Sequence, residues 1–304
     1  MEKVSCLGLP NCYRLANDTC EVVFTTDVGP RVAHYGRRGG ANILGAVPGV
    51  VLTTELGDWK PWGGHRLWAA PEAKPRSYAP DNAPVAFEFD DARTVRLVAP
   101  TEEQVGIQKE LRLALDAEGT GLTLEHRVTN QGAWPVELAP WAITIMAGGG
   151  EVIIPQEPFR TWSQALLPAR PFVLWHYTDM SDARFTFGRR YARLRAAADA
   201  PDPQKIGALC KLGWAAYLRG DELFVKRFPY EEGAPYPDYG CNVETYTAGD
   251  YVELESLAPL TRLEPGATAT HTERWYLFAG VEAGLTETAL EETIEPLVAA
   301  TTGV

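Results

Sequence analysis

Apolar and polar side chains alternate along the whole stretch Leu122-Thr123-Leu124-Glu125-His126-Arg127-Val128-Thr129. The run 111–115 does the same, with its three leucines on one face. Because neighbouring side chains of a β-strand point to opposite faces, this period of two predicts two half-buried strands. Asn130 and Gly132 then mark a turn into a further strand. His126 lies on the apolar face, so we expect it to be a hydrogen-bonded core histidine rather than a ligand.

Similar alternating runs recur at 85–89 and 271–278, and 28 glycines and 23 prolines cut the chain into short segments. Helical patterns are scarce. The segments 189–198 and 203–212 could each supply a short helix, and 286–300 gives the clearest one, with a capping threonine and an apolar stripe at helical spacing. The sequence therefore predicts an all-β protein, a large antiparallel β-sandwich with a few peripheral helices.

Composition supports a folded protein and does not exclude a small neutral ligand. The chain has 304 residues, of which 45% are hydrophobic and 22% charged, enough for a large core. No internal repeat or low-complexity linker is present, so we expect one domain over 1–304, with a C-terminal helix at about 286–300. The formal charge of −12 disfavours nucleic acid or an anionic membrane as a partner.

Targeting segments and cofactor motifs are missing from the sequence. No stretch approaches about 18 consecutive apolar residues, and the segment 1–15 lacks the apolar core of a secretory signal. The five cysteines form no C-x-x-C pair and match no zinc spacing, so we expect free thiols, no metal and a cytoplasmic protein. No phosphate loop, dinucleotide fingerprint or serine-hydrolase elbow occurs, so no cofactor is expected.

Aromatic and charged residues are concentrated in Trp59-Lys60-Pro61-Trp62-Gly63-Gly64-His65-Arg66-Leu67-Trp68-Ala69-Ala70-Pro71-Glu72. The two glycines allow a sharp turn or a close approach of a ligand to the backbone. Tryptophan rings suit the C–H faces of a sugar, and Arg66 and His65 supply hydrogen-bond donors. The alternative is a buried tryptophan loop in which Arg66 pairs with Glu72. The density of these residue types favours ligand binding.

A second unusual segment, 239–257, is typical of a hairpin around Ala248-Gly249. With a two-residue loop, the pairs that face each other across the strands are Tyr246 and Tyr251, Glu244 and Glu253, and Asn242 and Glu255. These six side chains then share one side, and the other side faces the core. Opposed carboxylates destabilise a sheet, so they indicate a raised carboxyl pKa, a cation or hydrogen-bond donors. A solvated acidic face is the alternative.

Short motifs also follow one another in a characteristic order. They are Thr26-Asp27-Val28-Gly29-Pro30-Arg31-Val32, Gly39-Gly40-Ala41-Asn42-Ile43-Leu44, Trp62-Gly63-Gly64-His65-Arg66-Leu67-Trp68, Thr129-Asn130 with Gly132, Asn242-Val243-Glu244-Thr245, Leu263-Glu264-Pro265-Gly266-Ala267 and Glu273-Arg274-Trp275. Because its motifs follow this order, the chain resembles the galactose mutarotase-like, or aldose 1-epimerase, superfamily over residues 20–280. It looks most similar to an uncharacterised branch, number 4380 among the domains of unknown function.

The resemblance implies a β-sandwich whose concave face binds a sugar. In such proteins an Arg binds the sugar, a Glu takes the proton from the anomeric hydroxyl and a His protonates the ring oxygen, so that the ring opens and recloses. Glu244 matches the position of the Glu, and Arg66 is the candidate for the Arg. The strand that carries the His in the family is Pro140-Trp141-Ala142-Ile143-Thr144 here, so His65 or His176 would have to replace it.

Three hypotheses follow. The first is a carbohydrate-active isomerase with Glu244 as the base and His65 as the acid. Its candidate substrate-binding residues are Arg66, Trp62, Trp68, Trp141, Glu72, Asn242, Glu253 and Glu255. The second is a non-catalytic carbohydrate-binding protein that uses the same cleft.

The third hypothesis is a metal-binding or structural module. Its oxygen ligands would be Glu244, Glu253, Glu255 and Asp238, which suit Ca²⁺ or Mg²⁺ better than zinc. No EF-hand loop is present, so this hypothesis ranks last. We therefore expect a small carbohydrate as the partner, and the sequence pattern indicates no particular oligomeric state.

Overall fold

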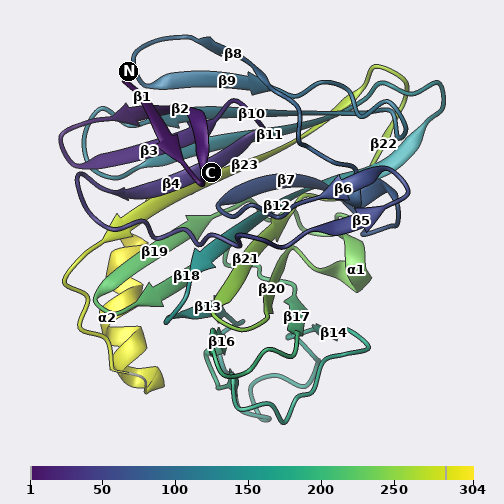
Figure 1. The fold of residues 1–304 in the computed structure, drawn as a ribbon. Coiled ribbons are helices and arrows are strands. Elements are labelled where there is room, and N and C mark those ends of the chain that lie inside the picture. Colours follow the sequence, from purple (N-terminus) through teal and green to yellow (C-terminus); the bar gives the residue numbers. More distant parts are fainter. Residues whose placement is uncertain (1, 285) are drawn as a thin grey trace.

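Two large antiparallel β-sheets make up most of the computed structural model, which describes residues 2–284 and 286–304 (Figure 1). Strands account for 46% of the chain and helices for 7%. The predicted all-β architecture is therefore confirmed. The predicted domain 1–304 also includes Met1 and Leu285, which lie outside the described residues.

The first sheet has 11 strands within the described residues. In spatial order they are β1 (Glu2–Cys6), β2 (Leu9–Ala16), β3 (Cys20–Thr25), β4 (Arg31–Arg37), β7 (His65–Ala70), β12 (Val136–Ala147), β21 (Tyr251–Leu257), β20 (Val243–Thr247), β17 (Gln204–Ala208) and β14 (Phe172–Leu174), with β22 (Thr261–Leu263) paired to the start of β12. Strands that are distant in sequence, such as β7, β12 and β21, are therefore direct neighbours. This order brings the tryptophan segment and the acidic hairpin together.

The second sheet has 10 strands in the same part of the chain. In spatial order they are β15 (Phe185–Phe187), β16 (Tyr191–Arg195), β13 (Glu151–Pro155), β18 (Trp214–Arg219), β19 (Glu222–Arg227), β23 (Thr268–Phe278), β11 (Leu122–Asn130), β10 (Ile107–Leu115), β9 (Thr94–Val98) and β8 (Ala86–Phe89). The strands β5 (Leu52–Thr54) and β6 (Gly57–Trp59) form a hairpin that belongs to neither large sheet. The alternating runs at 111–115 and 122–129 form β10 and β11, which pair with each other as expected.

The main core lies between the two sheets. In β10 and β11 every second residue is buried, which confirms the period of two. The rings of Tyr35, from the first sheet, and Trp275, from the second, have centroids 5.5 Å apart. Val243, Val252 and Leu254 belong to the same core cluster, so the hairpin directs its apolar side inwards as predicted.

Helices are few and peripheral in the described part of the chain: the 3₁₀ turn η1 (Arg76–Tyr78), the short α1 (Pro237–Gly240) and α2 (Glu287–Ala299). The C-terminal helix is confirmed as α2, and the hydroxyl of Thr286 accepts the predicted capping bond from the Ala289 N–H. Leu290, Ile294 and Val298 bury its stripe against β13, β18 and β19. The helix thus covers the outer face of the second sheet (Figure 1).

Two predicted helices are wrong. The segment 189–198 contains β16, and 203–212 contains β17. Each of these strands pairs on both sides, β16 with β13 and β15, and β17 with β20 and β14. Long-range pairing and burial thus override the local preference of these short segments for helix.

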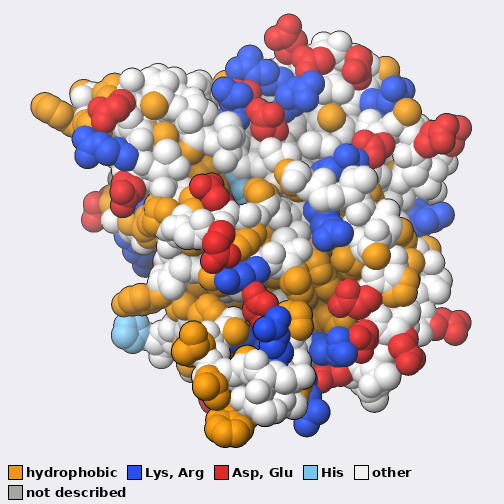
Figure 2. All heavy atoms as spheres, turned by 180° about the vertical axis from the view of Figure 1, so that it is seen from behind, with side chains coloured by type: hydrophobic (Ala, Val, Ile, Leu, Met, Phe, Trp, Pro, Cys, Tyr) orange, Lys and Arg blue, Asp and Glu red, His pale blue; other side chains and the backbone are white. Residues whose placement is uncertain are grey.

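The face of the molecule seen in Figure 2 carries charged side chains of both signs. In the view of Figure 2, Lys and Arg side chains are interspersed with Asp and Glu side chains. Within the described residues, none of the helices has the length and apolar character needed to cross a membrane. All five cysteines are free, as predicted.

Candidate functional site

Five adjacent strands, β7, β12, β21, β20 and β17, form the floor of the candidate site. We call their surface that points away from the main core the site face. Because side chains alternate along each strand, residues spaced by two share this surface. They are Arg66 and Trp68 on β7, Trp141 and Ile143 on β12, Glu253 and Glu255 on β21, Glu244 and Tyr246 on β20, and Lys205 on β17.

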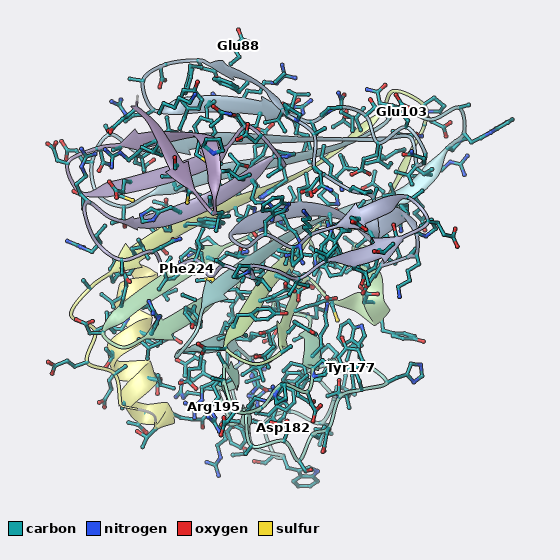
Figure 3. All side chains as sticks on the ribbon, in the orientation of Figure 1. Glu88, Glu103, Tyr177, Asp182, Arg195 and Phe224 are labelled. Atoms are coloured by element: carbon teal, nitrogen blue, oxygen red, sulfur yellow. The ribbon has the colours of Figure 1, made fainter. Side chains whose placement is uncertain are left out.

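A main cavity of about 470 Å³ opens on the site face. From the floor it is lined by Arg66, Trp68, Trp141, Ile143, Lys205, Tyr246 and Glu253. Its walls come from the segment 47–52, from Trp59 and Tyr78, and from Trp175 and Tyr177. Figure 3 labels Tyr177 at the end of the molecule near β14. The predicted residues Arg66, Trp68, Trp141, Glu72 and Glu253 all reach this cavity.

Arg66 lines the main cavity and has well-defined contacts with its neighbours. Its guanidinium carbon lies 5.5 Å from the centroid of Trp59 and 5.0 Å from that of Trp68. One nitrogen, Nη2, donates to Oε1 of Glu253 at 3.2 Å. The other two nitrogens are buried and have no hydrogen-bond partner among the described residues. Nε and Nη1, which together carry three N–H bonds, therefore have no protein partner among the described residues, and Arg66 pairs with Glu253 rather than with Glu72, the partner of the alternative interpretation.

Glu72 instead contacts the hydroxyl of Tyr78 at the rim of the main cavity. Burial raises the pKa of the Tyr78 hydroxyl, and the hydrogen bond to Glu72 raises it further. The phenol therefore stays protonated and donates to the carboxylate. Glu72 remains a candidate acceptor for a ligand hydroxyl.

Lys205 is a residue of the candidate site that the sequence did not indicate. Its Nζ lies 2.7 Å from Oε2 of Glu244 and 3.1 Å from Oε2 of Glu255. The same nitrogen lies 4.6 Å from the ring centroid of Trp141 and 4.7 Å from that of Trp175. Burial lowers the pKa of Lys205, but the two carboxylates outweigh it and raise that pKa well above its ordinary value. The Lys205 ammonium therefore stays positively charged at the floor of the main cavity.

The predicted register of the acidic hairpin is wrong by two residues. Glu244 pairs with Glu255, and Tyr246 pairs with Glu253, because the last pair before the loop is Thr247 with Val252. A shift of two keeps every side chain on its predicted face. The direct opposition of two carboxylates is therefore real, and Lys205 is the compensating cation.

Buried carboxyls on this floor hold their protons more tightly than usual. Burial raises the pKa of Glu244 well above its ordinary range; Lys205 opposes the shift, and Glu255 adds to it. Burial also raises the pKa of Glu253, with Arg66 opposing. Of the two, only Glu253 lines the main cavity; Glu244 is fully buried beneath Lys205. The carboxyl that can meet a ligand in this cavity is therefore Glu253.

His65 does not border the site face, contrary to expectation. It precedes Arg66 on β7, so its side chain points to the opposite side of the sheet, into the core. There Nδ1 lies 2.8 Å from the Thr144 hydroxyl and Nε2 lies 2.7 Å from Nε2 of His126. Burial lowers the pKa of His65 well below its ordinary value, and nearby His126 and Lys226 lower it further. The ring is neutral and has no contact with the main cavity.

His65 belongs to a buried polar cluster that we call the core network. Its other members are His126, Thr144, Lys226, Ser256, His271 and Glu273. The Nζ of Lys226 lies 2.9 Å from Oε1 of Glu273 and also donates to Thr144. His126 donates or accepts within this network, as predicted for a core histidine.

A metal could be considered in the core network. Among the described residues, only His65, His126 and Glu273 bring three candidate ligand atoms within 4.8 Å of one another. However, the two histidine nitrogens are already at hydrogen-bond distance, and Lys226 already supplies the positive charge beside Glu273. We therefore interpret the cluster as a hydrogen-bond network. The acidic residues of the third hypothesis form no such group within the described chain.

Three further predicted positions do not line the main cavity. The side-chain amide of Asn242 accepts a hydrogen bond from the Cys210 N–H and donates one to the Cys210 C=O. Trp62 lines a separate small cavity beside Lys60 rather than the main cavity. A side chain at Gly64 would come within 2.0 Å of the Val32 carbonyl oxygen, so the glycine is required by close packing of backbone rather than by a ligand.

Comparisons place the fold among known structures. A candidate aldose 1-epimerase from Escherichia coli K12 shares 13% identity at a TM-score of 0.52, covering 88% of this chain and 99% of that one. A galactose mutarotase-like protein from Lactobacillus casei shares 11% sequence identity at a TM-score of 0.55. The match covers 88% of this chain and 100% of that one. A protein from Parabacteroides distasonis described as containing a TPR domain shares 14% sequence identity at a TM-score of 0.59. The match covers 91% of this chain but only 49% of that protein.

No family model and no curated protein sequence matches the chain. Membership of branch 4380 therefore stays a prediction. The structural likenesses have low sequence identity, so they concern the fold alone. The chain has the galactose mutarotase-like fold that the order of its motifs predicted.

Proposed function

We propose that the protein binds a small carbohydrate in the main cavity. The observation that carries this proposal is Arg66, which packs against both Trp59 and Trp68 and has two buried nitrogens without a partner among the described residues. Buried polar groups without partners are rare and costly unless a ligand completes them. The volume of about 470 Å³ lies in the range of ordinary small-molecule sites.

A sugar suits the mixture of groups around the cavity. Hydroxyl groups donate and accept hydrogen bonds, so they can bind the donors Arg66 and Lys205 and the acceptors Glu253 and Glu72 at once. The apolar C–H faces of a pyranose suit the ring of Trp141 on the floor. The fold is shared with a candidate aldose 1-epimerase and a mutarotase-like protein, which supports the same ligand class.

Anomer exchange is the second candidate function. Glu253 favours it, because this carboxyl has a raised pKa and lines the cavity beside Arg66. A carboxyl with a pKa nearer to neutrality is better suited to proton exchange with a sugar hydroxyl. Glu244 and His65, the expected base and acid, do not reach the main cavity, so the isomerase hypothesis would have to use Glu253. The five free thiols support a cytoplasmic location.

The test compares wild type with Arg66→Lys by calorimetry and saturation-transfer NMR on a panel of aldoses. Lysine keeps the charge beside Glu253 but lacks the planar fork, so affinity should fall about tenfold to a hundredfold. Arg112→Lys, an exposed arginine paired with Asp90, is the matched control and should bind as wild type. Absence of sugar binding by the wild type, or equal affinity of Arg66→Lys, would refute the proposal. Polarimetry on the same sugars tests anomer exchange, and Glu253→Gln should abolish it.

A further inference from the structure

A small cavity of about 240 Å³ adjoins the main cavity. It is lined by the segment 46–51, Leu7, Lys60 and Trp62. Val47, Val50 and Val51 line both cavities, so the segment that contains them forms the wall between the two. The backbone N–H of Val47 donates to the carbonyl oxygen of Trp62 at 3.0 Å, which ties this wall to the tryptophan segment. A ligand in the main cavity therefore lies next to the small one.

The tryptophan segment contributes alternate residues to the two cavities. Trp59 and Pro61 line the main cavity, and Lys60 and Trp62 line the small one. The ammonium nitrogen of Lys60 lies 5.3 Å from the centroid of the Trp62 ring. The indole N–H of Trp62 is buried and has no hydrogen-bond partner among the described residues. Buried donors without partners are rare in proteins, and an acceptor atom of a ligand would satisfy this one.

The two cavities differ in polarity. The charged residues that line the main cavity are Arg66, Lys205, Glu253 and Glu72. The small cavity is lined by aliphatic side chains and backbone, apart from Lys60 and Trp62. A sugar hydroxyl placed there would lose its hydrogen bonds to water and find few new partners, which is unfavourable. An apolar group gains free energy from the same burial.

The wall between the cavities also exposes apolar surface. Val50, Val51 and Leu52 are consecutive in the chain, and their exposed fractions are 47%, 48% and 37%. Runs of exposed apolar residues are unfavourable unless a function requires them. An apolar group packed on Val50 and Val51 would remove this surface from water. The wall thus gives a second reason, independent of the lining, for an apolar occupant.

We propose that the small cavity binds the apolar aglycone of a glycoside whose sugar occupies the main cavity. This rests on the proposed function and deepens it, because it makes an aryl glycoside rather than a free sugar the preferred ligand. The occupant follows from the wall that the two cavities share and from their difference in polarity.

The small cavity has room for a six-membered ring. Its volume is about 240 Å³, and an apolar cavity of roughly 150 Å³ in another protein holds benzene. The Trp62 side chain offers such a ring an aromatic contact. A glycoside has no free anomeric hydroxyl, so a ligand of this kind is held without anomer exchange.

The experiment adds to the aldose panel the methyl and phenyl glycosides of each aldose, in both anomeric forms, and measures affinity by calorimetry on the full chain. The two glycosides differ only in the apolar group that they carry. Wild type should bind the phenyl glycoside of the aldose that it accepts about tenfold more tightly than the methyl glycoside.

Leu7→Asn should remove this preference while binding of the methyl glycoside is retained, because Leu7 lines the small cavity and not the main one. Asparagine tolerates the left-handed backbone at this position, where φ is 53°. Leu212→Asn, which changes an exposed leucine that lines neither cavity, is the matched control and should keep the preference of the wild type. Trp62→Leu is the second variant; it removes the flat ring and should also abolish the preference.

The outcomes separate the two proposals. Equal affinity of the wild type for the methyl and phenyl glycosides would overturn the aglycone site and leave the proposed carbohydrate function standing. Binding of free aldoses but of neither glycoside would have the same meaning. A preference for the phenyl glycoside that survives both Leu7→Asn and Trp62→Leu would show that the phenyl group lies elsewhere, and would also overturn the aglycone site. If neither aldoses nor glycosides bind, both proposals fail.

Discussion

Replacing Glu244 by glutamine is expected to stabilise the protein increasingly as the pH rises. Burial raises the pKa of this carboxyl well above its ordinary value of 4.5, and Glu255 and Asp238 raise it further against the opposing effect of Lys205. The folded protein therefore keeps a proton that the unfolded chain releases. The contribution of the Glu244 carboxyl to the free energy of unfolding is fully present below pH 4.5. It is lost as the pH rises towards the pKa of this group in the folded state.

The magnitude follows from one proton. The free energy of unfolding of the wild type should lose up to about 1.4 kcal/mol for each pH unit in that window, and the amide variant should not share this loss. Lys205 is not left alone in the variant, because Glu255 remains paired with it at 3.1 Å. The free energy of unfolding of Glu244→Gln should therefore rise relative to that of the wild type by up to about 1.4 kcal/mol for each pH unit in this window.

Urea unfolding of both proteins between about pH 5 and pH 8 measures this difference. Glu88→Gln, which removes an exposed carboxylate, should give a curve parallel to wild type. If Glu244→Gln also runs parallel to wild type, Glu244 is ionised when folded and the reasoning from its burial is refuted. A variant that is less stable at every pH would show instead that the ion pair with Lys205 outweighs the cost of burying the carboxyl.

Three further changes test the structural assignments. Lys226→Met leaves Glu273 without its counter-charge and should cost about 3–5 kcal/mol of stability in urea unfolding, much of it recovered by adding Glu273→Gln; an intact midpoint in the single variant would show that the pair is not formed. Burial lowers the pKa of His271 to about 3, so stability should fall as the pH drops below about 6.5, and His271→Gln should reduce that acid loss in the same measurement. Asn242→Ala should cost about 1–3 kcal/mol by unpairing the Cys210 backbone, with sugar affinity in calorimetry unchanged; a selective loss of affinity would return Asn242 to the binding site.

Local patterns were enough for strands with strict alternation, such as β10 and β11, and for the faces of the hairpin. A period of two identifies which side chains share a surface, and an error of two residues in the register leaves that surface intact. Which residues face each other across the hairpin depends on the length of the loop. The loop has four residues between Thr247 and Val252 instead of the expected two. Sequence reasoning thus predicted the opposed carboxylates correctly as a feature but assigned Glu244 the wrong partner.

The same rule of alternation separates His65 from Arg66. The two residues are adjacent on β7, so only one could face the ligand, and their joint assignment overlooked this. Lys205 could not be found in this way, because its segment has a helical pattern and it meets Glu244 only through the long-range pairing of β17 with β20.

The division of the main cavity into a sheet floor and loop walls determines how readily its specificity can be redesigned. Each floor residue is fixed by ladders of hydrogen bonds to neighbouring strands, so replacing one disturbs its neighbours. The walls at 47–52 and at Trp175 and Tyr177 belong to connections and short edge elements, and Val50, Val51 and Tyr177 are substantially exposed. Loops of this kind tolerate exchange and insertion. Libraries directed at these two segments should alter which ligand is accepted while leaving Arg66, Lys205 and Glu253 in place.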